Sequence, residues 1–301
     1  MRIVTRPDFD GIVCAVLLHE VENITADIHW VEPSDIQSKK AIIEKGDIIA
    51  NLPFDPNCSL WFDHHVSNMP DITVKGAFGI APSAAGVIFH HYKKQGKFSG
   101  RFDELIEQTD MIDSADLTKD QVQFPEKYPY LLLSMTIQNR GDGDPDYWNK
   151  LVDMLGRLPI ETVLTDSEVK DRCDAVIREN AQFGEFLTRH TTIEEKISIT
   201  DFRSLDTVPS GNRFLTYSLF PETIASAKIR YLGPDKAQVL LSIGRSIFNQ
   251  GCQVNIGNIL AQFGGGGHAG AGGCSLEAST AQEKIDQIIT IMKQNQKEEA
   301  K

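Results

Sequence analysis

The chain has 301 residues, and its acidic side chains outnumber its basic ones to give a formal net charge of −12. This balance excludes a general electrostatic attraction to duplex nucleic acid or to an anionic membrane surface. Hydrophobic residues make up 41% and charged residues 24% of the chain, which indicates a globular protein whose length favours two domains.

The number and spacing of the cysteines indicate that the protein works in a reducing compartment. There are five of them, far apart and without a C-x-x-C pair: Cys14, Cys58, Cys173, Cys252 and Cys274. This pattern argues against a disulfide framework and against a zinc ribbon. The longest early apolar run, residues 12–18, is too short for a signal or a membrane-spanning segment. We therefore expect a cytoplasmic location and no membrane association.

The first part of the chain alternates between strand and helix patterns. Strands are expected at 2–5, 26–31, 47–52 and 60–62, and helices at 11–21 and 33–45. Such alternation predicts a parallel sheet with helices on both faces. From about 83 to 156 the pattern becomes mainly helical, with helices expected at 83–94, 101–112, 128–139 and 145–158.

The second part begins after a long helical pattern without proline at 166–190. Strands are expected at 196–202, 213–220, 226–232 and 237–244, followed by a helix at 254–263, a strand at 273–276 and a final helix from about 279. We thus predict an α/β fold with an N-terminal domain at 1–165, a linker helix at 166–195 and a smaller mixed α/β domain at 196–301.

Two groups of acidic residues follow predicted strands of the same sheet. Asp63, His64 and His65 stand directly after one strand, and Asp8 and Asp10 stand between another strand and a helix. Because ligands bind at the carboxyl ends of strands in open α/β sheets, these groups can share one site. A carboxylate with imidazoles suits manganese, zinc, iron or cobalt better than calcium. A polar loop after an edge strand remains the alternative for the triplet.

Two further segments carry candidate residues. Asp110, Asp113 and Asp116 follow one another in "TDMIDSAD", where helix capping and solvation explain at least one of them. Near the other end, four glycines at 264–267 precede His268. A glycine run lets backbone amides approach an anion, although a flexible loop is the alternative.

The order of these segments resembles the DHH family of phosphoesterases over nearly the whole chain. The resemblance rests on "RPDFDG", "FDHH", "MIDSAD" and "FGGGGHAGAGG", with "APSAAGVIF" similar to the helix that follows the triplet in the family. It implies hydrolysis of phosphodiester or phosphoanhydride bonds with Mn²⁺ or a similar divalent metal. The implied metal ligands are Asp8, Asp10, His64 and Asp113, and the implied catalytic residues are Asp63 and His65. The implied substrate-binding residues are Arg245, Gly265, Gly266, Gly267 and His268.

Two positions depart from the family pattern. Val4 stands where the family has a histidine, and Asn51 stands where an aspartate bridges two metals. An amide carries no charge to balance a second dication, so we expect one strong metal site, formed by Asp10, His64 and Asp113.

The sequence thus predicts a metal-dependent hydrolase that acts on a small phosphorylated substrate, namely a short oligonucleotide, a dinucleotide, a nucleotide bisphosphate or polyphosphate. The alternative is a degenerate, non-catalytic member of the family that binds a nucleotide or phosphate as a regulatory protein. A homodimer is compatible with the sequence, and duplex nucleic acid is not an expected partner.

Overall fold

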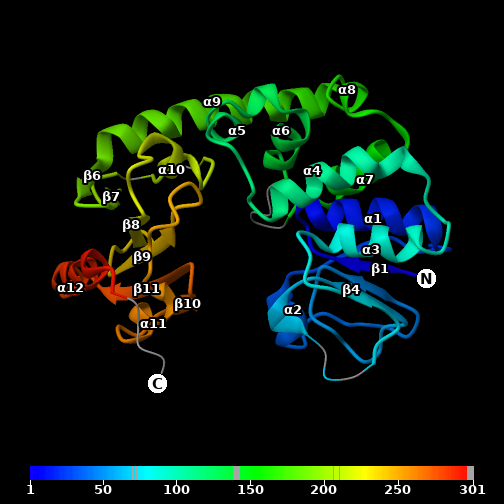
Figure 1. Ribbon diagram of the computed structural model, residues 1–301, viewed down its shortest axis with the longest axis horizontal. Helices are drawn as coiled ribbons and strands as arrows, with labels where there is room; N and C mark the ends of the chain where they lie inside the picture. Colours follow the sequence, from blue (N-terminus) through cyan, green and yellow to red (C-terminus); the bar gives the residue numbers. More distant parts are fainter. Residues whose placement is uncertain (70, 72, 138–142, 206, 210, 297–301) are drawn as a thin grey trace. The chain divides into compact units, whose positions relative to one another are not determined.

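The computed structural model describes residues 1–69, 71, 73–137, 143–205, 207–209 and 211–296. The chain folds into two compact units (Figure 1). The first comprises Met1–Leu117 and Pro125–Ala175, and the second comprises Thr118–Phe124 and Val176–Lys301.

Sheet A of the first unit is fully parallel, which confirms the prediction from the strand and helix alternation. Its order is β2-β1-β3-β4-β5. The strands are β1 (Ile3–Thr5), β2 (His29–Trp30), β3 (Ile48–Ala50), β4 (Leu60–Asp63) and β5 (Gly76–Phe78). Because the strands are parallel, their carboxyl ends all lie on the same side of the sheet, so the segments after β1, β3 and β4 come together there.

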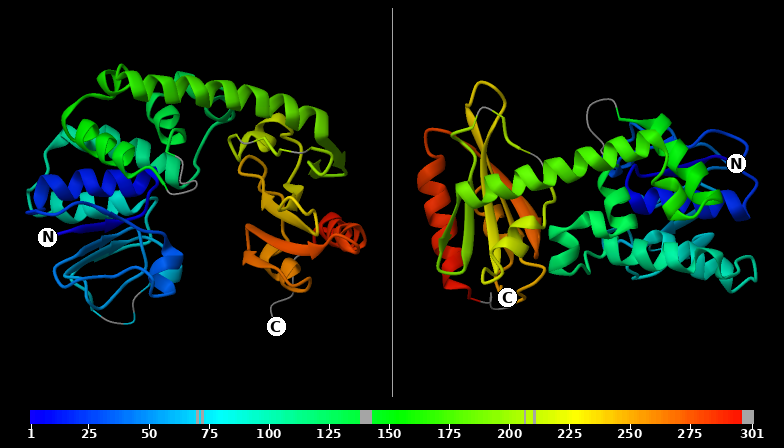
Figure 2. Two further views of the ribbon diagram at one scale, coloured as in Figure 1. Left: turned by 180° about the vertical axis from the view of Figure 1, so that it is seen from behind. Right: turned by 90° about the horizontal axis from the view of Figure 1, so that it is seen from above.

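Helices cover both faces of sheet A. On one face, Val4, Ile49 and Trp61 form a buried apolar cluster with Ile36 of the short helix α2 (Pro33–Gln37). On the other face lie α1 (Phe9–Val21) and α3 (Ala84–Lys93), which run side by side in both views (Figures 1 and 2). Val4 is therefore a packing residue of the apolar cluster.

The remaining helices of the first unit pack outside α1 and α3. They are α4 (Asp103–Asp113), α6 (Pro129–Met135), α7 (Pro145–Arg157) and α8 (Ile160–Val163), with 3₁₀ turns at Val66–Asn68, Gly100–Phe102 and Pro125–Lys127. The predicted helix at 128–139 is observed as α6, and residues 138 and 139 lie outside the described part of the chain. The helix α9 (Ser167–His190) runs from the first unit into the second.

The expected helix at 33–45 was largely wrong, because only Pro33–Gln37 is helical. Ser38 ends the helix, and Lys39 takes a left-handed backbone conformation with φ 57°. An L-residue in that conformation cannot continue a right-handed helix. The edge strand β5 was not predicted, since three residues are too few for a visible alternation.

Sheet B of the second unit is mixed, with the order β10-β11-β9-β8-β7-β6. Only β7 and β8 pair in parallel among its described strands. The strands are β6 (Thr191–Glu194), β7 (Ile197–Asp201), β8 (Ala225–Leu232), β9 (Gln238–Arg245), β10 (Gly266–His268) and β11 (Ala271–Glu277), and the helices are α5 (Lys119–Gln123), α10 (Leu215–Leu219), α11 (Ile256–Ala261) and α12 (Ala281–Gln294).

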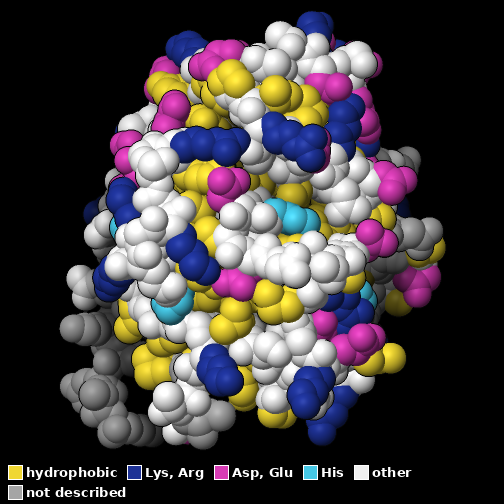
Figure 3. Space-filling model, turned by 90° about the vertical axis from the view of Figure 1, so that its right-hand side faces the viewer, with side chains coloured by type: hydrophobic (Ala, Val, Ile, Leu, Met, Phe, Trp, Pro, Cys, Tyr) yellow, Lys and Arg dark blue, Asp and Glu magenta, His cyan; other side chains and the backbone are white. Residues whose placement is uncertain are grey.

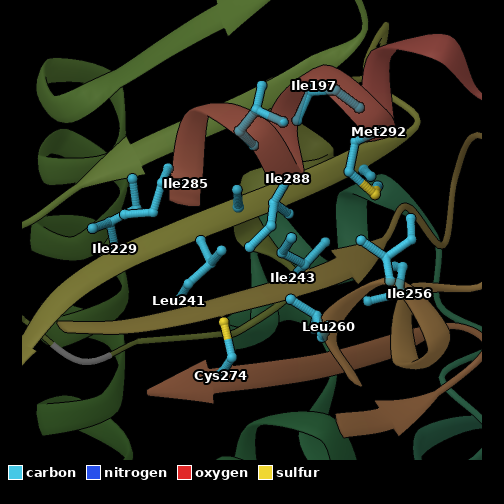
Figure 4. Packing of buried hydrophobic residues seen from close by; sticks show 14 of the residues in the cluster. Ile197, Ile229, Leu241, Ile243, Ile256, Leu260, Cys274, Ile285, Ile288 and Met292 are labelled. Atoms are coloured by element: carbon cyan, nitrogen blue, oxygen red, sulfur yellow. The ribbon is translucent and has the colours of Figure 1, made fainter. Parts of the chain in front are cut away.

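One face of sheet B forms the core of this unit. Leu241 and Ile243 of β9 pack against Ile288 and Met292 of α12 and against Leu260 of α11 (Figure 4). Strand side chains alternate between faces, so the residues between these core positions project from the opposite face. That opposite face carries the polar residues of β8 and β9.

The expected strand at 213–220 was wrong, because Leu215–Leu219 forms the short helix α10. Four of its five residues are buried, and Tyr217 packs over β8 and β9 with its hydroxyl bound by Ser226. A short run that is buried on nearly all sides has neither the strand nor the helix periodicity, so the pattern alone could not identify it.

Among the described residues, no helix is long and apolar enough to cross a membrane. On the face shown in Figure 3, Lys and Arg side chains are interspersed with acidic and hydrophobic ones. The described side chains of this face form no continuous basic stripe of the kind that tracks a nucleic-acid backbone.

Candidate metal centre

Asp8 and Asp10 stand in the connection from β1 to α1 but have different surroundings. Asp8 is the N-cap of α1, where its carboxylate accepts a hydrogen bond from the Gly11 amide at 2.8 Å. It also lies 3.3 Å from the Arg6 guanidinium. Removal from water raises the pKa of Asp8 to about 6, and Arg6 opposes this effect. Because the Asp8 carboxylate has already lost most of its hydration in the folded protein, little further desolvation would oppose the binding of a second cation beside it.

Asp10 is buried and is held by the first turn of α3. Its two carboxylate oxygens accept hydrogen bonds from the amides of Ala84 and Ala85 at 2.9 and 2.8 Å. Burial raises the pKa of Asp10 well above its usual value, and the nearby carboxylates of Asp113 and Asp8 raise it further. A helix N-terminus supplies only partial positive charge, and Arg6 beside Asp8 supplies one full positive charge for the carboxylates of Asp8, Asp10 and Asp113.

The start of α3 is fixed by Ser83 and Asp110. Ser83 is the N-cap, where its hydroxyl accepts from the Gly86 amide and donates to the Asp110 carboxylate. A Cβ at Gly86 would come within 2.7 Å of that carboxylate, which explains the glycine. Asp110 is thus a positioning residue that holds Ser83, and through it the amides that bind Asp10.

Asp63 organises the triplet. It is fully buried, and its Oδ1 accepts from the His64 amide at 2.8 Å and from the His65 Nδ1 at 2.8 Å. Its Oδ2 accepts from the Asn68 side-chain amide at 2.6 Å. The hydrogen bond to Asp63 raises the pKa of His65, whose side chain is 40% exposed. Asp63 therefore positions both histidines and favours a protonated His65.

His64 presents one ring nitrogen to the acidic cluster. Its Nδ1 lies 2.9 Å from the Ala81 carbonyl, which can only accept, so Nδ1 is the donor in this hydrogen bond. Its Nε2 is buried without a hydrogen-bond partner, 3.4 Å from Asp113 Oδ2 and 4.0 Å from Asp10 Oδ2. A backbone acceptor on one nitrogen and a bare second nitrogen is the usual state of a metal-binding histidine.

Asp10, His64 and Asp113 form a group that could hold a metal ion, since their ligand atoms all lie within 4.8 Å of one another. Asp63, His64 and His65 form a second such group. Asp113 ends α4, so three separate segments converge on the first group. One nitrogen and two carboxylates match the ligand preference of Mn²⁺ and similar divalent ions. The His64 Nε2, which has no hydrogen-bond partner, is placed to bind such an ion.

Asn51 lies beside this cluster, at the end of β3. It is buried and takes a left-handed conformation with φ 57°, which asparagine tolerates better than most residues. Its Nδ2 donates to Asp8 Oδ1 at 3.0 Å, while its Oδ1 is buried without a partner. Asp47, at the start of the same strand, is instead held by Arg2 through two hydrogen bonds. Asp47 is therefore a structural residue, and it lies at the amino-terminal ends of the strands, away from the cluster at their carboxyl ends.

The predicted substrate residues lie together in the second unit. Arg245 ends β9, and its backbone amide donates to the Gly270 carbonyl in the turn between β10 and β11. Its Nη2 donates to the Val254 carbonyl at 2.6 Å, whereas its Nε is buried without a partner. The exposed His268 ends β10. The structure brings Arg245 and the glycine hairpin into one region of this unit.

The glycine run is a paired strand rather than an open loop. Gly266 and Gly267 belong to β10 and pair with Gly273 and Gly272 of β11. A Cβ at Gly265 would come within 2.3 Å of the Cys274 Cβ. Close packing of the two strands therefore accounts for several of these glycines without any bound anion.

Three contributors to the candidate metal centre were not predicted from the sequence: the Asn68 side chain, the Ala81 carbonyl and the Asp110 carboxylate as the partner of Ser83. Asn68 and Ala81 carry no sequence signal, because an isolated asparagine or a backbone carbonyl is found in any loop. Asp110 stood among the acidic candidates, but its partner becomes visible only when α3 and α4 pack together.

A scan against protein-family models found no match, and neither did a search of curated proteins. Among solved structures, the pGpG-specific phosphodiesterase PggH from Vibrio cholerae is 33% identical, with a TM-score of 0.87 over 98% of this chain and 99% of that chain.

More distant structures share the fold. A DHH-domain structure described as a member of a family of ribosomal proteins is 10% identical, with a TM-score of 0.61 over 96% of this chain and 85% of that chain. RecJ from Thermus thermophilus in complex with Mn²⁺ is 14% identical, with a TM-score of 0.55 over 97% of this chain and 52% of that chain. With the convergent Asp10, His64 and Asp113, these similarities lead to one conclusion: the chain belongs to the DHH family of phosphoesterases.

Proposed function

We propose that this protein is a divalent-metal-dependent phosphodiesterase that hydrolyses short linear nucleotides, with pGpG as the first substrate to test. The observation that carries the proposal is the buried, unpartnered His64 Nε2 between the carboxylates of Asp10 and Asp113. A bound cation would balance this excess of negative charge, which in the metal-free protein raises the pKa of Asp10. In the DHH family the corresponding residues hold a metal.

The metal would be held by Asp10, His64 and Asp113, with Asp8 beside them. When bound, such an ion neutralises phosphate charge and lowers the pKa of water from 15.7 to roughly 7 in favourable sites. Asp63 holds the two histidines in place through its hydrogen bonds.

We assign proton donation to His65. Its side chain is half-buried, and its hydrogen bond to Asp63 favours the protonated ring. In hydrolysis of a phosphodiester the leaving sugar oxygen needs a proton, which a histidine of this kind can supply. We therefore propose that His65 donates the proton and that Asp63 holds His65 in position.

The second unit would bind the substrate through Arg245, His268 and the glycine hairpin. The Arg245 side chain has one nitrogen committed to the Val254 carbonyl and a buried Nε without a partner. A planar guanidinium with unused donors suits a phosphate. Gly265, Gly266 and Gly267 keep side chains away from the backbone there.

Two arguments favour a short nucleotide as substrate. The relative at 33% identity is a pGpG-specific phosphodiesterase, and the net charge of −12 disfavours long polyanions. Inorganic polyphosphate is thus a weaker candidate. A second candidate function, nucleotide binding without turnover, is favoured by the neutral Asn51 beside Asp8, which removes a charge from the place of a second metal.

The test is a substrate panel with metal-stripped protein, assayed with Mn²⁺ and with EDTA. The panel contains pGpG, a short oligoribonucleotide, phosphoadenosine phosphate, pyrophosphate and polyphosphate, and released mononucleotide or phosphate is measured by chromatography. We expect Mn²⁺-dependent conversion of pGpG to GMP as the fastest reaction. Binding of pGpG without any turnover would support the non-catalytic alternative, and faster release of phosphate from polyphosphate would overturn the substrate assignment.

A further inference from the structure

Lys228 of β8 projects from the face of sheet B that lies opposite the hydrophobic core. Its neighbours Ala227 and Ile229 point into that core. The Lys228 ammonium lies over the ring of Phe183 of α9, 5.4 Å from the ring centroid. The side chain is therefore held on the polar face of the sheet, partly shielded from water.

A second cation stands beside Lys228. The Lys228 Nζ makes one long hydrogen bond, 3.4 Å, to the Arg213 carbonyl. Burial and, to a smaller extent, the nearby positive charge of Arg213 together lower the pKa of Lys228 to about 8. Within the described part of the chain, neither side chain forms an ion pair with an acid. Two adjacent cations, one of them shielded from water, cost free energy unless an anion joins them.

Further hydrogen-bond donors surround this pair. Ser242 of β9 is the register partner of Lys228, so its hydroxyl stands on the same face one strand away. Arg230 is two residues further along β8 and therefore projects from the same face. Neither Ser242 nor Arg230 forms an ion pair or a strong side-chain hydrogen bond in the described residues. In a protein of net charge −12, this is a local concentration of uncommitted donors.

We propose that Lys228 and Arg213, assisted by Ser242, bind a phosphate group of the substrate other than the one that is hydrolysed. This inference rests on the proposed function, in which the substrate is a short linear nucleotide. A terminal 5′-phosphate is the matching group, because it carries up to two negative charges and several acceptor oxygens for these donors. The site would then make the enzyme prefer 5′-phosphorylated dinucleotides over unphosphorylated ones.

The experiment measures binding of pGpG and of GpG, which differ only in the 5′-phosphate, by calorimetry in EDTA so that no hydrolysis occurs. The variants are Lys228→Met, the charge-keeping Lys228→Arg, and Lys284→Met as a matched control. Lys284 lies on α12, on the core side of the sheet, and its substitution removes the same charge from the same unit.

Wild type and Lys284→Met should bind pGpG about 10-fold or more tightly than GpG, because charge-assisted hydrogen bonds of this kind are strong. Lys228→Met should lose this preference, and Lys228→Arg should keep most of it, which separates a lost charge from misfolding. A wild type without the preference, or a Lys228→Met variant that retains it, would overturn the proposal. If the preference depends on Lys228 but Mn²⁺ produces no hydrolysis, the phosphate site stands and the proposed function fails.

Discussion

Replacing Asn51 by aspartate tests how the neutral amide shapes the metal centre. In the wild type the Asn51 Nδ2 donates to Asp8 Oδ1 at 3.0 Å. The substitution puts a carboxylate oxygen in the place of that donor. Aspartate tolerates the left-handed conformation at this position about as well as asparagine, so the backbone is expected to stay in place.

The expected cost in the metal-free protein combines two effects. Loss of a hydrogen bond to a charged group costs about 1.5–3 kcal/mol. The two carboxylates also repel each other, although proton uptake limits this cost, because the pKa of Asp8 is already raised to about 6. We expect Asn51→Asp to lower the free energy of unfolding by about 2–4 kcal/mol and the Tm by roughly 5–10 °C.

Manganese should reverse this loss, since the new carboxylate adds both a ligand and a charge for a second ion. The assay is thermal unfolding in EDTA and in saturating MnCl₂, combined with elemental analysis of bound manganese. Asn51→Gly is the control, because glycine keeps the left-handed backbone and removes the donor without adding charge. Wild type should hold close to one ion per chain and Asn51→Asp more. Equal stability of Asn51→Asp and wild type in EDTA, or two tightly bound ions in wild type, would refute this reasoning.

Three further predictions concern single residues. His64→Ala should reduce kcat at least ~100-fold, because it removes a proposed metal ligand. It should lower the free energy of unfolding by only about 1 kcal/mol, the contribution of one hydrogen bond to Ala81. A variant that keeps wild-type turnover at saturating manganese would contradict this prediction. Asp47→Ala should lower the free energy of unfolding by about 2–3 kcal/mol in urea titrations, because it breaks a partly buried pair with Arg2. The same substitution should leave the manganese affinity measured by calorimetry unchanged. The pKa of Asp8 in the folded protein is about 6, above the ordinary 3.8, so Asp8 should make the metal-free protein lose stability as the pH rises from about 4 to 6. The Tm of the wild type, measured relative to that of Asp8→Asn, should therefore fall over this range, and a Tm that rose instead would contradict the prediction.

The arrangement of the N-terminal unit could be predicted because strand direction determines where side chains meet. Asp10 follows β1 and His64 follows β4, and parallel pairing brings both strand ends to one edge. Asp113, which the segment "MIDSAD" offered as a candidate, ends α4. For Asp10 and His64 the geometry of a parallel sheet gave the expectation, whereas Asp113 was expected from the resemblance to the DHH family.

Other features depended on tertiary contacts that have no sequence period. The run at 213–220 became α10 because Tyr217 packs over Gly244, where a side chain would collide with its hydroxyl. The glycine run became β10 because β11 offered a partner strand at close range. The bond from Asn68 to Asp63 likewise requires the loop after the triplet to fold back. Such pairings are set by the assembled unit and could not be derived from local patterns.

Our proposal that Asp10, His64 and Asp113 hold the catalytic metal can be tested by anomalous diffraction from crystals soaked in MnCl₂, with data collected at the manganese absorption edge. We expect one strong peak within coordination distance of His64 Nε2 and of carboxylate oxygens of Asp10 and Asp113, and no such peak in crystals of His64→Ala. A manganese peak elsewhere in the chain, with none at these three residues, would show that they do not hold the metal.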